Sequence, residues 1–181
     1  MGALGRHASI SQAMPHPVNM REATTADWPQ IWPIVEPVIR AGDAYVLPQD
    51  WLEDQARSYW FQTGNEVFVA EAAGTTLGTY FLRANALGPG SHIANCGYMT
   101  APAARGQGIA RAMCLHSLAR AKSRGFHAMH FNFVVSTNAA ALRLWQQLGF
   151  EIVGTLPGAF RHAELGYVDA YVMFRTLDNV A

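Results

Sequence analysis

The residues with the clearest chemical potential lie in the segment 98–111, between a strand-like run and a helical run. Gly106 and Gly108 allow a tight turn that aims several backbone N–H groups at one point. The helix that follows adds partial positive charge at its N-terminus, which suits a pyrophosphate. Arg105 and Arg111 supply cations that form charge-assisted hydrogen bonds with phosphate. We therefore expect an anion-binding loop here.

Three kinds of phosphate-binding loop compete for this segment. A P-loop requires Gly-Lys-Ser/Thr, and the segment contains no lysine. A dinucleotide-binding loop requires a small residue at the position of Arg111 and follows the first strand of a βαβ unit. The segment instead reads Arg105-x-x-Gly108-x-Ala110, which resembles the coenzyme A pyrophosphate loop of the GCN5-related N-acetyltransferases (GNAT). The alternative is a glycine-rich strand-to-helix turn that binds no ligand.

A second segment, 138–150, strengthens this resemblance. It is similar to the other signature of the family, with Asn138 at a helix start, the aromatic Trp145 further along, and Gly149-Phe150 leading into a strand. The resemblance covers residues 18–176. It implies an acetyl-CoA-dependent enzyme with acetyl-CoA as cosubstrate, and no metal is expected.

The resemblance also implies how coenzyme A is bound. Two parallel strands, 91–100 and 127–135, are implied to splay apart, and the free backbone groups of the first bind the pantetheine arm. The amine enters from the opposite side. The residues implied to bind coenzyme A are Tyr98, Met99, Thr100, Arg105, Gly106, Gln107, Gly108, Ile109, Ala110, Arg111, Asn138 and Trp145.

The acid and base that the family commonly uses are missing from their expected places. The strands implied to splay contain no carboxylate, and Trp145 occupies the position of the family's tyrosine. Tryptophan does not give up a proton at a useful pKa. A thiol pKa of about 8.5 makes thiolate a fair leaving group without an acid. The resemblance implies direct attack by the amine in a ternary complex, and we expect this step to proceed without a general acid.

Asn95 and Asn132, one on each strand implied to splay, are the polar residues expected to be catalytic and to contact the substrate. An amide can hold a thioester carbonyl oxygen, a substrate carboxylate or a water molecule at any pH. The pair resembles a fungal GNAT subgroup that acetylates proline analogues such as azetidine-2-carboxylate. The alternative is that both amides satisfy bulged backbone groups, with His130 as the base on the same strand face.

Two further residues are expected to contact the acceptor. Tyr45 lies in the loop 41–49, which borders the acceptor pocket across the family, and Arg161 lies in an expected loop, 156–166, as a partner for a substrate carboxylate. We expect a small-molecule amine acceptor, an amino or imino acid. The alternatives are acetylation of a protein N-terminus or lysine, and a non-catalytic acetyl-CoA-binding sensor.

The hydrophobic pattern predicts the elements that position these residues. Alternating and apolar runs predict strands, and Trp28–Arg40 is expected to form a helix kinked or broken at Pro33 and Pro37. The result is an α/β fold, a single mixed sheet of about seven strands with helices on both faces. The expected strands are 18–23, 66–72, 75–83, 91–100, 127–135, 150–155 and 167–176, and the expected helices are 28–40, 51–63, 109–124 and 138–148.

Length and composition limit the number of domains, the kinds of partner and the cellular location that we expect. The chain has 181 residues, half of them hydrophobic and 14% charged, which predicts a loose tail at 1–17 and one domain at 18–181. Thirteen basic and thirteen acidic residues argue against a nucleic-acid partner, and the low charge density favours a homodimer. No apolar run approaches the roughly 20 residues that span a bilayer, so no membrane partner is expected. Two cysteines without metal-ligand spacing favour a cytoplasmic protein.

Overall fold

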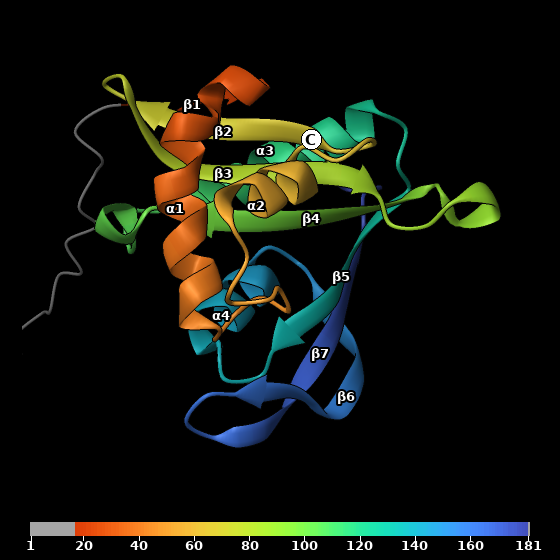
Figure 1. Cartoon of the computed structure of the whole chain (residues 1–181). Coiled ribbons are helices and arrows are strands. Elements are labelled where there is room, and N and C mark those ends of the chain that lie inside the picture. Colours follow the sequence, from red (N-terminus) through yellow and green to blue (C-terminus); the bar gives the residue numbers. More distant parts are fainter. Residues whose placement is uncertain (1–16, 181) are drawn as a thin grey trace, which may run out of the picture.

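One open sheet organises the chain (Figure 1), described here for residues 17–180 of a computed structural model. Its seven strands lie in the order β1-β2-β3-β4-β5-β7-β6, which confirms the predicted mixed sheet. The strands are β1 Asn19–Glu22, β2 Glu66–Ala72, β3 Thr75–Ala84, β4 Ile93–Thr100, β5 Ala128–Val135, β6 Glu151–His162 and β7 Gly166–Thr176. The predicted tail lies outside the described residues, apart from residue 17.

Four α-helices accompany the sheet within residues 17–180: α1 Trp28–Ala41, α2 Glu53–Trp60, α3 Ile109–Ser123 and α4 Ala139–Gln147. The predicted break in α1 is wrong, because the helix continues through Pro33 and Pro37. Both prolines lie on the exposed face, so the carbonyl groups that lose their N–H donors can be hydrated by solvent. No helix in this range is both long and apolar enough to cross a membrane.

The helices cover both faces of the sheet because the strand residues alternate. Val67, Val69 and Phe81 pack in the core beneath α1 and α2. Tyr80 and Leu82 point the other way, into the core shared with α3 and α4. Figure 1 shows α1 and α2 in front of the central strands and α3 behind them. The site between β4 and β5 is therefore held by two separate cores.

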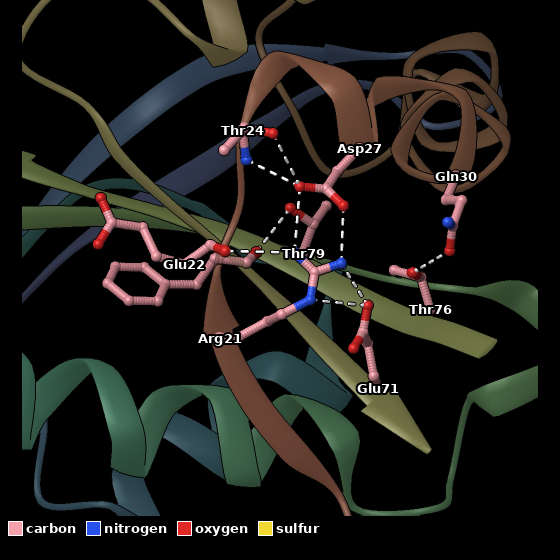
Figure 2. A network of polar contacts seen from close by, with 9 residues as sticks. Arg21, Glu22, Thr24, Asp27, Gln30, Glu71, Thr76 and Thr79 are labelled. Carbon is pink, nitrogen blue, oxygen red and sulfur yellow. Dashed lines mark hydrogen bonds and ion pairs between the residues drawn. The ribbon is translucent and has the colours of Figure 1, made fainter. Parts of the chain in front are cut away.

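An ionic network fixes the start of the fold (Figure 2). The Arg21 guanidinium donates to Asp27 Oδ1 at 2.6 Å and to Glu71 Oε1 at 2.6 Å, and so joins β1, the turn before α1, and β2. The Thr24 backbone N–H also donates to Asp27, at 2.8 Å. The hydrogen bonds from Arg21 hold the pKa of Asp27 below its usual value. Together these contacts orient α1 on the sheet.

The predicted loop 156–166 is wrong, because most of it belongs to a long hairpin formed by β6 and β7. Pro157 and Gly158 look like strand breakers, but β6 is an edge strand, where a missing N–H disrupts no further strand pairing. The pairing with β7 shifts register between Leu156 and Phe160, which absorbs the irregular residues as a bulge. The hairpin closes at its tip, residues 162–166, where His162 pairs with Gly166.

The strands β4 and β5 form the parallel pair of the sheet, and they separate almost at once. Their register contains only Ile93 opposite Ala128 and Ala94 opposite Met129. Beyond these pairs β5 stays bonded to β7 on its other side, and Figure 1 shows β4 and β5 diverging as a V. The separation leaves one edge of β4 without a strand partner.

Candidate active site

A cavity of about 840 Å³ occupies the space between the separated strands. Residues 95–100 of β4 and 131–135 of β5 form its walls. Thr137, Asn138, Ala141 and Trp145, in and before α4, line it as well. Residues 43–46 of the α1–α2 loop and His162, Glu164 and Leu165 at the hairpin tip also line it. The lining also includes Val38, Tyr59, Phe81, Arg83 and Arg105, so the cavity is built from segments spread along most of the chain.

The free edge of β4 offers backbone hydrogen-bonding groups to the cavity. The Tyr45 hydroxyl donates to the Tyr98 carbonyl oxygen at 2.8 Å, so this carbonyl points away from β3 and into the gap. Because backbone direction alternates along a strand, Cys96 and Thr100 aim their N–H and C=O groups the same way. An extended ligand laid along β4 can pair with these groups as an added strand does.

The predicted anion loop lies at one end of this edge. Gly106 and Gly108 have φ values of +76° and +81°, in the left-handed region that favours glycine. A Cβ at either glycine would meet nothing within 4 Å, so this surface of the loop is open. The first N–H groups of α3 have no intrahelical acceptors. Ile109 is 1% exposed, so its contribution to a ligand is its backbone N–H. The open loop suits a pyrophosphate.

Loop and cavity are continuous through Arg105, which lines the cavity. Of the residues predicted to bind coenzyme A, Tyr98, Met99, Thr100, Arg105, Asn138 and Trp145 line the cavity, whereas Gly106, Gln107, Gly108, Ile109, Ala110 and Arg111 form the adjoining turn and first helical turn. The Asn138 Oδ1 also accepts the Ala141 N–H at 3.2 Å and so caps α4. An open anion loop joined to a free strand edge has the shape and polarity that coenzyme A requires.

Asn95 and Asn132 both line the cavity, but the structure gives them different surroundings. The Asn95 side chain is 7% exposed, and its Nδ2 donates to the His130 carbonyl oxygen at 2.8 Å, across the point where β4 and β5 part. Asn132 is exposed and lies in the β5 bulge, where pairing with β7 shifts between Phe131 and Val134. Asn95 thus bridges the two strands, and the bulge re-aims Asn132.

Asn85, at the end of β3, was not anticipated and connects this region. Asn132 Nδ2 donates to Asn85 Oδ1 at 2.7 Å, and Asn85 Nδ2 lies 3.1 Å from His130 Nδ1. In this arrangement Nδ1 is the acceptor, so the proton of the neutral imidazole is on Nε2. Burial lowers the pKa of His130. His130 is therefore a neutral ring with an engaged nitrogen, and it does not line the cavity.

Tyr45 and Gly97 shape the wall beside the asparagines. A Cβ at Gly97 would lie 2.6 Å from Phe81 Cε1 and 3.2 Å from the Tyr45 hydroxyl oxygen. Only glycine therefore lets the phenol and the ring approach β4 this closely. Burial raises the pKa of Tyr45, so its hydroxyl stays protonated and acts as a hydrogen-bond donor.

Trp145 forms the opposite wall, where it packs against aromatic neighbours. Its ring lies 5.2 Å from that of Tyr98 at 36° and 5.2 Å from that of Phe131 at 61°. The Tyr98 hydroxyl lies 2.6 Å from Ser117 Oγ, on the α3 side, and burial raises the pKa of Tyr98 well above its usual value. Neither ring presents a readily lost proton to the cavity.

The buried thiols do not supply an acid or a nucleophile. Burial raises the pKa of Cys114 to about 12 and also raises the pKa of Cys96. Both therefore remain neutral thiols near neutral pH. Within residues 17–180, no group of three or more His, Cys, Asp and Glu side chains is arranged to hold a metal ion.

The structure adds charged residues that the sequence did not identify. Arg83 of β3, Asp43 and Glu164 all line the cavity, whereas Arg161 does not. The carboxylates come from a loop and from the hairpin tip, so a search along the splayed strands could not find them. Arg83 is two residues after Phe81 in β3, so the two side chains share one face of the sheet. This spacing was the sequence feature that could have placed Arg83.

Comparison with known proteins gives the same picture. Residues 19–150 match the sequence profile of the acetyltransferase (GNAT) family. A GCN5-related N-acetyltransferase from Kribbella flavida superposes with a TM-score of 0.84 at 42% identity, over 88% of this chain and 97% of that one. The protein yncA from Salmonella typhimurium, solved with its cofactor acetyl-CoA, shares the fold with a TM-score of 0.78 at 24% identity, over 91% of this chain and 96% of that one.

Among curated proteins, N-acetyltransferase aca1 of Schizosaccharomyces pombe is 38% identical over 97 residues. The match covers 53% of this chain and 46% of the relative, so the chain spans about half the length of that protein.

Proposed function

Because the chain belongs to the acetyltransferase (GNAT) family, we propose that it transfers the acetyl group of acetyl-CoA to the amine of a small amino or imino acid. The observation that carries this proposal is the gap between β4 and β5, with two paired positions, a free backbone edge and an open anion loop at one end. The pyrophosphate would lie on 105–111 and the pantetheine arm along β4. The thioester would then lie near Asn95 and Asn132.

The reaction balances without a covalent enzyme intermediate. The neutral amine nitrogen forms a bond with the thioester carbonyl carbon, and the carbon–sulfur bond breaks. The amine loses one proton and the coenzyme A thiolate gains one, so the products are an amide and a thiol. An asparagine amide donates to the carbonyl oxygen as negative charge develops on it. Each Nδ2 already donates one hydrogen bond, from Asn95 to the His130 carbonyl and from Asn132 to Asn85, and keeps a second N–H. Asn132 has the more accessible amide, because it is exposed and Asn95 is buried.

The hairpin tip supports a small acceptor over a peptide. His162, Glu164 and Leu165 line the same cavity as Asn132, so β6 and β7 cover the side from which the acceptor enters. A peptide acceptor needs an open groove on that side. The resemblance to the subgroup that acetylates proline analogues points the same way, and azetidine-2-carboxylate belongs among the first acceptors to try.

Thiol release tests the proposal directly. The protein is incubated with acetyl-CoA and a panel of amino acids, imino acids, simple amines, N-terminal peptides and lysine peptides. We expect acceptor-dependent thiol release that is greatest with an amino or imino acid. Release with peptides alone would overturn the small-acceptor assignment. Tight acetyl-CoA binding by calorimetry with no release from any acceptor would instead identify a sensor.

The homodimer is also a proposal. β6 is an edge strand and exposes Ile152, Val153 and Leu156, with Val153 58% exposed. A contact between two copies would cover these aliphatic side chains. Multi-angle light scattering measures the mass in solution, and a monomer at all concentrations would refute the dimer.

A further inference from the structure

The side chain of Arg83 lies in the cavity beside Asn95, on the wall that the sheet forms. Arg83 of β3 is the antiparallel partner of Asn95 in β4, so both side chains leave the same face of the sheet at Cα atoms about 5 Å apart. Arg83 is partly buried and lines the cavity. It therefore places a guanidinium next to the point where β4 and β5 separate.

The Arg83 guanidinium is held in place but not neutralised. Its Cζ lies 5.3 Å from the centroid of the Phe81 ring. That ring is fixed by edge-on contacts with Trp60 at 5.0 Å and with Tyr59 at 6.1 Å. Within residues 17–180, Arg83 forms no ion pair or side-chain hydrogen bond, unlike Arg21 and the other paired arginines. A planar cation resting on a rigid ring, with its N–H groups unused, is ready for a bidentate anion.

Arg83 is better placed than the other charged residues near the cavity to bind an anion beside Asn95. Arg105 stands at the opposite end, beside the anion loop, and Arg161 lies outside the cavity. Asp43 and Glu164 come from the α1–α2 loop and the hairpin tip, so the wall that the sheet forms carries one charge, and it is positive.

We infer that Arg83 binds the carboxylate of the acceptor, which makes the acceptor an α-amino or α-imino acid. This inference rests on the proposed acetyl transfer. In such acids one carbon separates the nitrogen from the carboxylate. A carboxylate on Arg83 therefore keeps the nitrogen beside Asn95, at the gap where the thioester would lie. Acids with a longer spacer would carry the nitrogen past this point.

Matched acceptors and variants test the assignment. Wild type, Arg83→Gln and Arg83→Lys are assayed by thiol release with the best acid of the panel and its carboxamide, beginning with L-proline and L-prolinamide. We expect wild type to prefer the acid at least tenfold in kcat/KM. Arg83→Gln should remove at least tenfold of that preference, mainly through KM, with little change for the carboxamide. Arg83→Lys should recover part of it, since it restores the charge but not the fork.

The control is Arg57→Gln, which removes a surface arginine of α2 paired with Asp54 and should leave both acceptors unaffected. Calorimetric acetyl-CoA affinity, unchanged in Arg83→Gln, shows that the fold is intact. Equal losses for acid and carboxamide, or no loss for the acid, would overturn the Arg83 assignment alone. Absence of thiol release by wild type with every acceptor would overturn the proposed function as well.

Discussion

Asn95 and Asn132 should respond differently to truncation, because only Asn95 bridges the separating strands. Asn95→Ala removes the 2.8 Å hydrogen bond to the His130 carbonyl, and a buried acceptor left without its donor costs about 1–3 kcal/mol. At about 2–4 °C per kcal/mol for a domain of this size, we expect Tm to fall by about 2–12 °C. Asn132 is exposed, so Asn132→Ala should change stability by no more than about 0.5 kcal/mol.

Activity adds the second half of this prediction. If either amide holds the carbonyl oxygen or the acceptor, its alanine variant should lose at least about tenfold in kcat/KM, since an oxyanion donor is typically worth about 10²–10³. Asn95→Asp should be less stable than Asn95→Ala, because it turns a carboxylate oxygen toward the His130 carbonyl. Scanning calorimetry and thiol release measure the two effects separately.

Two results would refute this reasoning. An unchanged Tm for Asn95→Ala would show that the bridge to His130 contributes nothing to the fold. Normal turnover by both alanine variants, together with an inactive His130→Ala, would make histidine the base and the amides structural.

Three other perturbations follow from the structure. Gly108→Val forces a branched residue into φ +81° and fills the open loop, so acetyl-CoA affinity should fall at least about tenfold by calorimetry, whereas Gly125→Val, at φ +83° beyond the other end of α3, should retain it. Trp145→Phe should keep most activity and Trp145→Tyr should gain less than about tenfold, since a larger gain would show that thiolate protonation limits the rate. The pKa of Asp27 is lowered in the folded state, so its contribution is present above the usual carboxyl pKa and lost as pH falls through the lower one. Urea unfolding between pH 6 and 3 should show about 1 kcal/mol of this loss in wild type and none of it in Asp27→Asn.

The sequence pattern predicted most helices and strands, because the hydrophobic periodicity and the boundary residues of each lie within the segment itself. The helix from Ile109 and the strands flanking Ala73-Gly74 each carry their period and boundaries within a few residues. The long α1 and the β6–β7 hairpin were harder, because proline and glycine usually end such elements. Whether they do depends on what faces the freed backbone groups. At Pro33 the freed carbonyl group is on the solvent-exposed side of α1. At Pro157 the missing N–H is on an edge strand, which has no further strand to bond.

Some features of the candidate site were likewise predictable from local sequence, and others were not. The anion loop is a property of consecutive residues, since the two glycines and the start of the next helix set its conformation and its charge. The amino-acid sequence alone therefore determined the family resemblance, the loop and the two asparagines as polar groups on strands. The family resemblance also placed Trp145 at the position of the family's tyrosine, and residue type alone shows that tryptophan cannot supply the proton there.

Tertiary structure decided which side chains share the cavity. Arg83 meets Asn95 through antiparallel register, Asn85 joins Asn132 to His130, and the hairpin tip arrives from the far end of the sheet. These contacts join residues far apart in the chain, so no local pattern specifies them. They depend on strand order and on where β4 and β5 part, and both are set by packing against two helical layers.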